Sequence, residues 1–239
     1  MLKGKTILAV VPARGGSKGV PLKNIYPLLG RPLLAYVGDV VREAGYFDRA
    51  IVSTDHLQIA EAAQEMGLDV PFYRPESLSG DRISDYDVLL HTLTAIEQLD
   101  HRQYDIVVML QPTCPLRTTC QVTAAITKLI DEAWDAVWTV SMTDLKYHPL
   151  KQLALADDGK LNYYDAQGGS IIARQQLGQV YHRNGAVYVF TRECLLNEKT
   201  TLAKRTGALV LDDAMVSIDT LDDFETVERL LIARAPKVL

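Results

Sequence analysis

The sequence "ILAVVPARGGSKGVPLKN" (residues 7–24) joins a short apolar run to a glycine-rich, cationic loop. The apolar run carries several β-branched side chains, as expected of a strand that is buried on both faces. The loop contains three glycines, two prolines and the cations Arg14, Lys18 and Lys23. Flexible backbone and concentrated positive charge at the end of a buried strand predict a site for an anion such as phosphate.

Two common glycine motifs for phosphate do not fit this loop. A P-loop needs Gly-Lys-Ser/Thr at its end, whereas Lys18 is followed by a glycine. The dinucleotide fingerprint needs G-x-G-x-x-G spacing, which is absent, and its turn is far less cationic. The remaining interpretation is a loop whose cations bind several phosphate oxygens at once. The alternative is a solvated basic turn without a ligand.

Strand and helix patterns alternate along the first part of the chain. Short apolar runs predict buried strands, and helical spacing of Leu, Ile, Val and Ala predicts helices between them. The strands are expected at 7–11, 50–53, 106–110 and 136–140, and the helices at 32–44, 58–66, 86–99 and 121–133. This alternation predicts an α/β fold with a mostly parallel sheet that is covered on both faces.

Polar clusters follow three of the predicted strands, at Ala13–Gly16, Thr54–Asp55 and Gln111–Thr113. In such sheets ligands bind beyond the carboxyl ends of the strands. Three clusters at one edge therefore predict a shared site, although each cluster by itself also fits ordinary turn chemistry.

The alternation stops between Met142 and Tyr181. An Asp-Asp-Gly turn signal at 157–159 lies between two β-prone segments and predicts a hairpin. Strands are expected again at 186–190 and 208–211, followed by a closing helix at 220–233. We therefore predict a core of residues 1–141 and 182–239, with an appended arm of residues 142–181.

The composition restricts the class of protein. The chain has 239 residues, 48% of them apolar, which suits one globular domain with a small appendage. A net charge of −5 argues against a general nucleic-acid binder. The absence of a long apolar stretch or signal-peptide pattern predicts no membrane association and a cytoplasmic location. Three irregularly spaced cysteines predict reduced thiols.

The loop "PARGGSKGVPLKN" resembles the signature of the CMP-N-acetylneuraminate (CMP-sialate) synthetases, cytidylyltransferases that activate nine-carbon acidic sugars. Seven further segments are similar to motifs of that family and follow in its order. They are "IVSTD" (51–55), "RPESLSGD" (74–81), "LQPTCPLR" (110–117), "HPLK" (148–151), "RQQL" (174–177), "RNGAVYVF" (183–190) and "SIDTLDDF" (217–224). The resemblance implies a three-layer α/β/α Rossmann-like fold with a mostly parallel mixed sheet and a protruding dimerisation arm.

Members of this family join CTP to a 2-keto-3-deoxy sugar acid and release pyrophosphate. The resemblance therefore implies CTP and a nonulosonic acid as substrates, Mg²⁺ as cofactor with Mn²⁺ as an alternative, and a homodimer with shared active sites. In the reaction the anomeric hydroxyl at C2 of the sugar attacks the α-phosphorus. Such a transfer needs positioning and charge neutralisation rather than covalent help from the protein.

The resemblance assigns most candidate residues to the nucleotide. Arg14 and Lys23 are implied to be catalytic, with Lys23 stabilising charge at the α-phosphate. Arg74, Ser84 and Asp85 fall where the family recognises cytosine and ribose. For Arg74 the alternative is an ordinary solvated cation of a helix or loop. The exocyclic amine of cytosine could instead be bound by backbone carbonyls. The implied nucleotide-binding set is Ala13, Arg14, Gly15, Gly16, Lys18, Lys23, Asn24, Arg74, Ser84 and Asp85.

Three residues are assigned to the sugar in the same way. Gln111 is implied to bind its hydroxyls, and Arg174 to pair with its carboxylate, for which the planar guanidinium is suited. Lys151 is implied to reach into the active site of the partner subunit. As isolated residues, Lys151 and Arg174 are equally typical of ordinary exposed cations.

The implied metal site departs from the family pattern. Relatives show Asp-Ile-Asp-Thr, where two carboxylates share one strand face. This chain has Ser217-Ile218-Asp219-Thr220, so Asp219 is the implied metal ligand and the third catalytic residue. The number of metal ions and the general base stay open, because Asp212 and Asp213 compensate only if their loop folds back. Cys114 stands where the family has serine and is interpreted as a packing residue.

Two alternatives to the CMP-sialate reading remain. A CMP-KDO synthetase, which acts on an eight-carbon acid, would show Ser-Thr-Arg in the opening loop, where this chain has Ser17-Lys18-Gly19. A nucleotide-binding module that has lost catalysis is suggested by Ser217. The joint presence of Arg14, Lys23, Gln111 and Asp219 argues against such loss.

Overall fold

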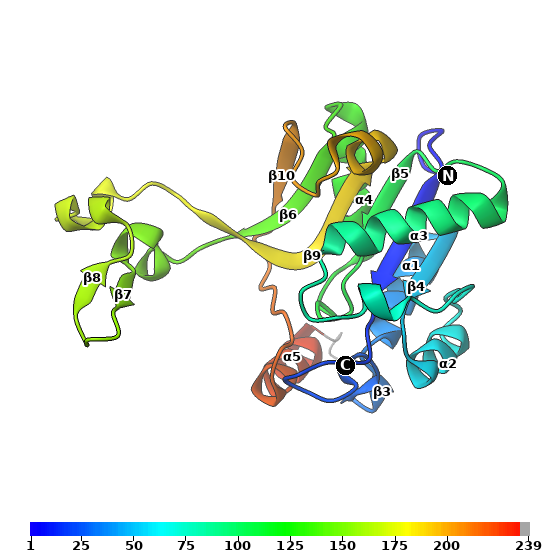
Figure 1. Ribbon diagram of the computed structural model, residues 1–239, viewed down its shortest axis with the longest axis horizontal. Helices are drawn as coiled ribbons and strands as arrows, with labels where there is room; N and C mark the ends of the chain where they lie inside the picture. The colour runs from blue at the N-terminus through cyan, green and yellow to red at the C-terminus, as the bar shows by residue number, and fades with distance from the viewer. Residues whose placement is uncertain (235–239) are drawn as a thin grey trace, which may run out of the picture.

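A computed structural model describes residues 1–234, and its centre is a six-stranded sheet in the order β10-β6-β9-β5-β1-β4 (Figure 1). The strands are β1 Ile7–Pro12, β4 Arg49–Ser53, β5 Ile106–Met109, β6 Ala136–Met142, β9 Tyr181–Thr191 and β10 Thr206–Val210. β9 runs antiparallel to β5 and β6, whereas the other neighbouring pairs are parallel. The predicted mostly parallel mixed sheet is confirmed.

Helices cover both faces of this sheet. They are α1 Ala35–Ala44, α2 Leu57–Glu65, α3 Asp85–Asp100, α4 Thr119–Asp131 and α5 Leu221–Arg234. Strand β1, which lies between β5 and β4, shows the layering, because its alternate side chains enter different cores. Ile7, Ala9 and Val11 pack with α1, α2 and α4, whereas Leu8 and Val10 pack with α3. The three-layer α/β/α arrangement is confirmed.

Two predicted boundaries were wrong for identifiable reasons. The first helix begins at Ala35 rather than at residue 32, because Arg31–Pro32 (β3) pairs with Pro27–Leu28 (β2) in a small antiparallel ribbon. The predicted strand at 186–190 is only the inner half of β9, which begins at Tyr181. The polar residues of its outer half concealed that continuation from a reading of apolar runs. The last part of the predicted core, 235–239, lies outside the described residues.

A buried polar cluster lies where β6 and β9 leave the sheet. The Thr139 hydroxyl donates to Asn184 Oδ1 at 2.8 Å, and the backbone N–H of Ala186 donates to the same oxygen at 3.1 Å. Asn184 Nδ2 donates to the Ser141 hydroxyl at 3.1 Å. The pairing of β6 with β9 shifts register here, between Trp138 and Val140. Asn184 therefore satisfies backbone and side-chain groups that the irregularity would leave unpaired.

Beyond this cluster the chain from β6 to β9 extends away from the sheet (Figure 1). It carries the antiparallel hairpin of β7 Leu153–Leu155 and β8 Leu161–Tyr163, as the Asp-Asp-Gly signal predicted. We call residues 142–181 the arm. Several large apolar side chains of the arm are exposed, and Ile172 reaches 93%.

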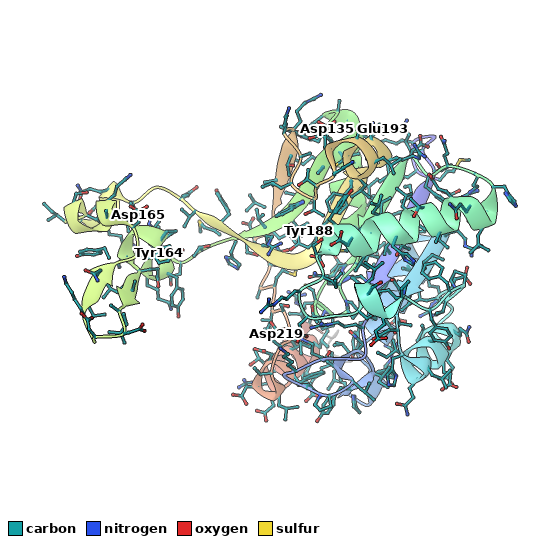
Figure 2. The ribbon with its side chains drawn as sticks, viewed as in Figure 1. Asp135, Tyr164, Asp165, Tyr188, Glu193 and Asp219 are labelled. Atoms are coloured by element: carbon teal, nitrogen blue, oxygen red, sulfur yellow. The ribbon has the colours of Figure 1, made fainter. Side chains whose placement is uncertain are left out.

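Besides the two cores on the faces of the sheet, a third apolar cluster lies beyond the carboxyl ends of its parallel strands. It packs Val20 of the opening loop and Leu28 of β2 against Ile218 and against Phe224 of α5. The opening loop is thereby held beside the segment that carries Asp219. Figure 2 shows Asp219 next to α5, far from the labelled arm residues Tyr164 and Asp165.

Two expectations from composition can be compared with the structure. Cys114, Cys120 and Cys194 are free thiols, the first and last of them buried. Among the helices of residues 1–234, none has both the length and the apolar character that crossing a bilayer requires.

We expect Asn184→Ala to lower the free energy of unfolding by about 1–3 kcal/mol, because the hydroxyl of Thr139 and the N–H of Ala186 lose a buried acceptor. Urea denaturation measures this change. Asn162→Ala is the matched control, since Asn162 is exposed on β8, and it should stay within about 0.5 kcal/mol of the parent. Equal losses in the two variants would contradict the role of Asn184.

Candidate active site

A cleft opens at the carboxyl ends of β1 and β5, where the sequence predicts a shared site. It consists of two adjoining cavities of about 270 and 420 Å³. Both are lined by Pro12, Arg14, Asn24 and Thr113. We call the smaller one the first cavity and the larger one the second cavity.

The structure brings most of the predicted site residues to this cleft. Arg14 and Asn24 line both cavities. The first cavity also contains Arg74, Asp85 and Gln111, and the second contains Lys18, Lys23 and Asp219. Residues from distant parts of the chain thus surround one continuous space.

Arg74 is buried, with only 6% of its surface exposed, so the alternative of a solvated loop cation is wrong. Its guanidinium donates to the backbone carbonyls of Ser53 and Leu78. Burial lowers the pKa of Arg74 below its ordinary value. Arg74 therefore ties the end of β4 to the following loop and presents a partly desolvated cation to the first cavity.

Ser84 and Asp85 start α3 and have different roles. The Ser84 hydroxyl accepts a hydrogen bond from the N–H of Asp87 at 3.2 Å and caps the helix. Ser84 is absent from the lining of both cavities, whereas Asp85 lines the first. Desolvation raises the pKa of Asp85, and the positive charges of Arg183 and Arg74 partly oppose that rise. Asp85 is thus the acceptor that α3 presents to the cleft.

Two cations of the opening loop share one carboxylate. Arg14 Nη1 lies 2.8 Å from Asp81 Oδ1, and Lys18 Nζ lies 2.5 Å from Asp81 Oδ2. Asp81 also lines the first cavity. It belongs to the "RPESLSGD" segment but was not among the predicted site residues, because a lone acidic residue in a loop carries no local signal of such pairing.

Lys23 connects the opening loop with the far end of the chain. Its Nζ donates to the carbonyl oxygen of Ile218 at 2.7 Å and to Asp219 Oδ1 at 2.8 Å. The Lys23 side chain is 12% exposed, whereas that of Asp219 is 75% exposed. The ammonium group is therefore fixed, while most of the carboxylate faces the open cleft.

Backbone groups of the loop are partly engaged already. The N–H of Ala13 donates to the carbonyl of Ser53 at 3.0 Å, and Ala13 is fully buried and lines neither cavity. The N–H of Gly15 donates to Asp55 Oδ1 at 2.8 Å. A Cβ at Gly16 would meet no atom within 4 Å. Gly16 therefore borders open space.

Asn24 braces the loop as well as lining the cleft. It is 5% exposed, and its Nδ2 donates to the carbonyl of Arg14 at 3.0 Å. The amide thus joins the two ends of the loop and fixes the backbone from which the Arg14 side chain extends.

Gln111 occupies a restricted space at the end of β5. Gly185, with φ of 74°, lies beside it, and a Cβ there would come within 3.0 Å of Gln111 Oε1. The positive φ and the close approach both favour glycine. The adjacent Thr113 accepts from the Ser217 hydroxyl at 3.3 Å and, through its carbonyl, from the N–H of Ile218 at 2.8 Å.

Arg117 supports this turn and was missed by the sequence analysis. Its guanidinium is buried and donates to the carbonyls of Gln111 and Cys114. Burial lowers the pKa of Arg117 to about 10, and no carboxylate of residues 1–234 forms a salt bridge with it. Cys114 is also buried, and desolvation raises the pKa of its thiol. The cysteine is therefore a packing residue with a protonated thiol.

Lys151 and Arg174 lie in the arm and do not reach the cleft of their own chain. Both are exposed and line a separate cavity of about 320 Å³ within the arm. The structure thus brings the two predicted sugar-binding cations together but separates them from Gln111.

The donors near Asp219 fit a substrate-borne Mg²⁺ rather than a cage built by the protein alone. Ser217 contributes a neutral hydroxyl, Asp213 Oδ2 accepts from Gln121 Nε2 at 2.8 Å, and neither Asp212 nor Asp213 lines the cavity that contains Asp219. Within the described residues no group of three His, Cys, Asp or Glu side chains is placed to hold a metal ion. Mg²⁺ commonly uses one or two carboxylates together with substrate phosphates.

We expect Gly19→Ala to destabilise the contact between the opening loop and Asp219, because the new Cβ would lie 2.2 Å from the Asp219 carbonyl oxygen. A loss of about 1–3 kcal/mol in the free energy of unfolding is expected from such overpacking. Gly178→Ala is the matched control, since a Cβ there meets nothing within 4 Å. A Gly19 variant as stable as this control in urea denaturation would show that the loop moves freely.

Comparisons with known proteins place this geometry in context. Residues 8–233 match the family described as "Cytidylyltransferase". The chain is 34% identical over 221 residues to an N-acylneuraminate cytidylyltransferase of Streptococcus agalactiae, covering 91% of this chain and 51% of that protein. It thus spans about half the length of that relative.

A second relative is matched over nearly its whole length. This is the pseudaminic acid cytidylyltransferase of Campylobacter jejuni, which is 31% identical over 219 residues, covering 91% of this chain and 93% of that protein. Among solved structures, a CMP:2-keto-3-deoxy-manno-octonic acid synthetase complexed with CTP superposes with a TM-score of 0.70. It is 18% identical and covers 95% of this chain and 99% of its own, which supports the fold. The chain therefore belongs to the cytidylyltransferase family.

Proposed function

We propose that this protein is a cytidylyltransferase that couples CTP to a nonulosonic acid and releases pyrophosphate. The observation that carries the proposal is the convergence of Arg14, Lys18 and Lys23 on one cleft with Gln111 and Asp219. The relatives named for N-acylneuraminate and for pseudaminic acid support a nine-carbon acid as the second substrate.

The two cavities suggest how CTP binds. The first cavity, with Arg74 and Asp85, suits cytosine and ribose. Asp85 supplies an acceptor for the exocyclic amine of cytosine, where uracil presents an oxygen instead. The second cavity, with Lys18 and Lys23, suits the phosphates. Asn24 lies at the junction and holds the loop in shape for both parts.

The residues around the phosphates account for the reaction without a covalent intermediate. The C2 hydroxyl of the acid attacks the α-phosphorus, and charge develops on the leaving pyrophosphate. Lys23 is held in place by the carbonyl of Ile218, and we assign its ammonium group to the charge at the α-phosphate. Arg14 and Lys18 hold the outer phosphate oxygens, and Gly16 leaves room for their close approach.

Asp219 is the residue that would hold Mg²⁺, and Mn²⁺ has similar ligand preferences. When bound, the ion supplies further neutralisation of phosphate charge. Because Ser217 is neutral and Asp213 is engaged elsewhere, the chain offers one carboxylate at this position. We therefore expect one protein carboxylate to serve the metal.

The arm, residues 142–181, is proposed to pack on a second copy of the chain and to place Lys151 and Arg174 in its cleft. The separation of these cations from their own cleft supports this arrangement. Exposed apolar side chains in the arm, such as Leu155, Tyr164 and Ile172, are typical of an interface surface. A core of 1–141 and 182–239, a homodimer and a cytoplasmic location are parts of the same proposal.

The assay that tests this function measures pyrophosphate release from CTP with a panel of acids, namely neuraminate, its deaminated form, legionaminate, pseudaminate and KDO. We expect turnover with at least one nonulosonic acid in Mg²⁺ and none in excess EDTA. Turnover with KDO alone would favour the eight-carbon alternative. No turnover with any of these acids would overturn the enzymatic proposal and leave a nucleotide-binding module.

We expect Lys23→Ala to lower kcat by about 100-fold or more, because the oriented positive charge at the α-phosphate is lost. The Kd for CTP should change by less than about tenfold, since Arg14 and Lys18 still bind the triphosphate. Steady-state kinetics and calorimetric titration separate the two effects. Lys128→Ala removes a half-buried lysine of α4 that pairs with Glu132 and lines neither cavity, and it serves as the control. Equal small effects on kcat and Kd would mean that Lys23 is only a neighbour of the site.

Subunit complementation tests the shared site. Lys23→Ala impairs the cleft of its own chain, whereas Lys151→Ala impairs the cleft of the partner. Mixing the two inactive variants should restore about a quarter of the parental rate, because half of the dimers are mixed and each mixed dimer keeps one intact site. If Lys151 acts within its own chain, mixing restores nothing. If Lys151 has no role, the Lys151→Ala variant by itself keeps the parental rate.

A further inference from the structure

One carboxylate lies between two cations that the proposed function assigns to the triphosphate. Both oxygens of Asp81 are engaged, one by Arg14 at 2.8 Å and the other by Lys18 at 2.5 Å. Hydrogen bonding to Lys18, followed by that to Arg14, lowers the pKa of Asp81. The group is therefore an anion at neutral pH, held in the position expected for an anionic ligand.

The same pattern extends to the rest of the opening loop. The N–H of Gly15 is bound by Asp55, and Lys23 by Asp219. Each of these donors already has a carboxylate oxygen, so an incoming polyphosphate competes with carboxylates for them. Asp81 differs from the other two carboxylates because it alone pairs with two cations of this loop.

We propose that Asp81 is a displaceable substitute for a phosphate group, which it replaces until the nucleotide binds. It orients Arg14 and Lys18 before the nucleotide binds, releases both to the phosphates, and re-forms its two ion pairs when pyrophosphate leaves. This inference rests on the proposed function. As a consequence, Asp81 weakens the binding of any polyphosphate. The effect is expected to be largest for pyrophosphate, because it has no base or ribose and depends on these cations alone.

The test is calorimetric titration of the full-length protein with inorganic pyrophosphate and, separately, with CTP. Asp81→Asn removes the competing charge at nearly constant size, so the Kd for pyrophosphate should fall by about tenfold, and that for CTP should fall as well. Asp81→Glu retains the charge and should stay near the parental value. Asp81→Ser removes the charge with a smaller side chain and should reproduce the tighter binding if the asparagine variant folds poorly.

Asp39→Asn is the matched control. Asp39 also bridges two arginines, Arg31 and Arg42, and its side chain is 36% exposed against 41% for Asp81. It lines neither cavity of the cleft. Its substitution changes the net charge by the same amount, so an effect of overall charge alone would appear in both variants, whereas displacement at the site affects only Asp81.

The outcomes separate this inference from the proposed function. Tighter binding in Asp81→Asn and Asp81→Ser, without change in Asp39→Asn, supports the exchange. Unchanged or weaker binding in both Asp81 variants, with a parent protein that binds CTP, overturns it and leaves the proposed function intact. A parent protein that binds neither CTP nor pyrophosphate would instead overturn the proposed function itself.

Discussion

The contact of Lys23 with Ile218 and Asp219 joins the opening loop to a segment near the other end of the chain. Apolar packing of Val20 against Ile218 and Phe224 lies beneath this contact. The apolar packing and the polar contact act together. The packing brings the two segments side by side, and the ammonium group of Lys23 then donates to a carbonyl and a carboxylate. Without this contact Asp219 would no longer line the second cavity. The proposed metal ligand would then lie apart from the cations proposed to bind phosphate.

Charge in the cleft is organised as local pairs within a chain of net charge −5. Arg14 and Lys18 face Asp81, and Lys23 faces Asp219. Several cations can gather in one place at low cost because each has a counter-ion nearby. Anion binding to such a site exchanges one negative partner for another, so the affinity depends on the carboxylates as much as on the cations.

The arm and the core differ in how their apolar side chains are covered. Within the core, strands such as β1 are buried on both faces by helices of the same chain. In the arm, short strands expose apolar side chains, and Asn184 anchors the point of departure through buried hydrogen bonds. An arm that is fixed at its base and exposes apolar side chains at its end is suited to pack against another molecule, as proposed for a second copy of the chain.

Local pattern was sufficient to predict the α/β class and most strand and helix positions, because side-chain periodicity acts over a few residues. The anion-binding character of the loop stays a prediction from its glycine content and charge. Packing alone decided which groups meet. It buried Arg74 and bound Asp213 to Gln121 rather than placing it at the proposed metal position. It also placed Asp81 between Arg14 and Lys18. Such pairings join residues far apart in the chain, and no local pattern encodes them, because they arise only when the sheet and its helices set the distances between loops.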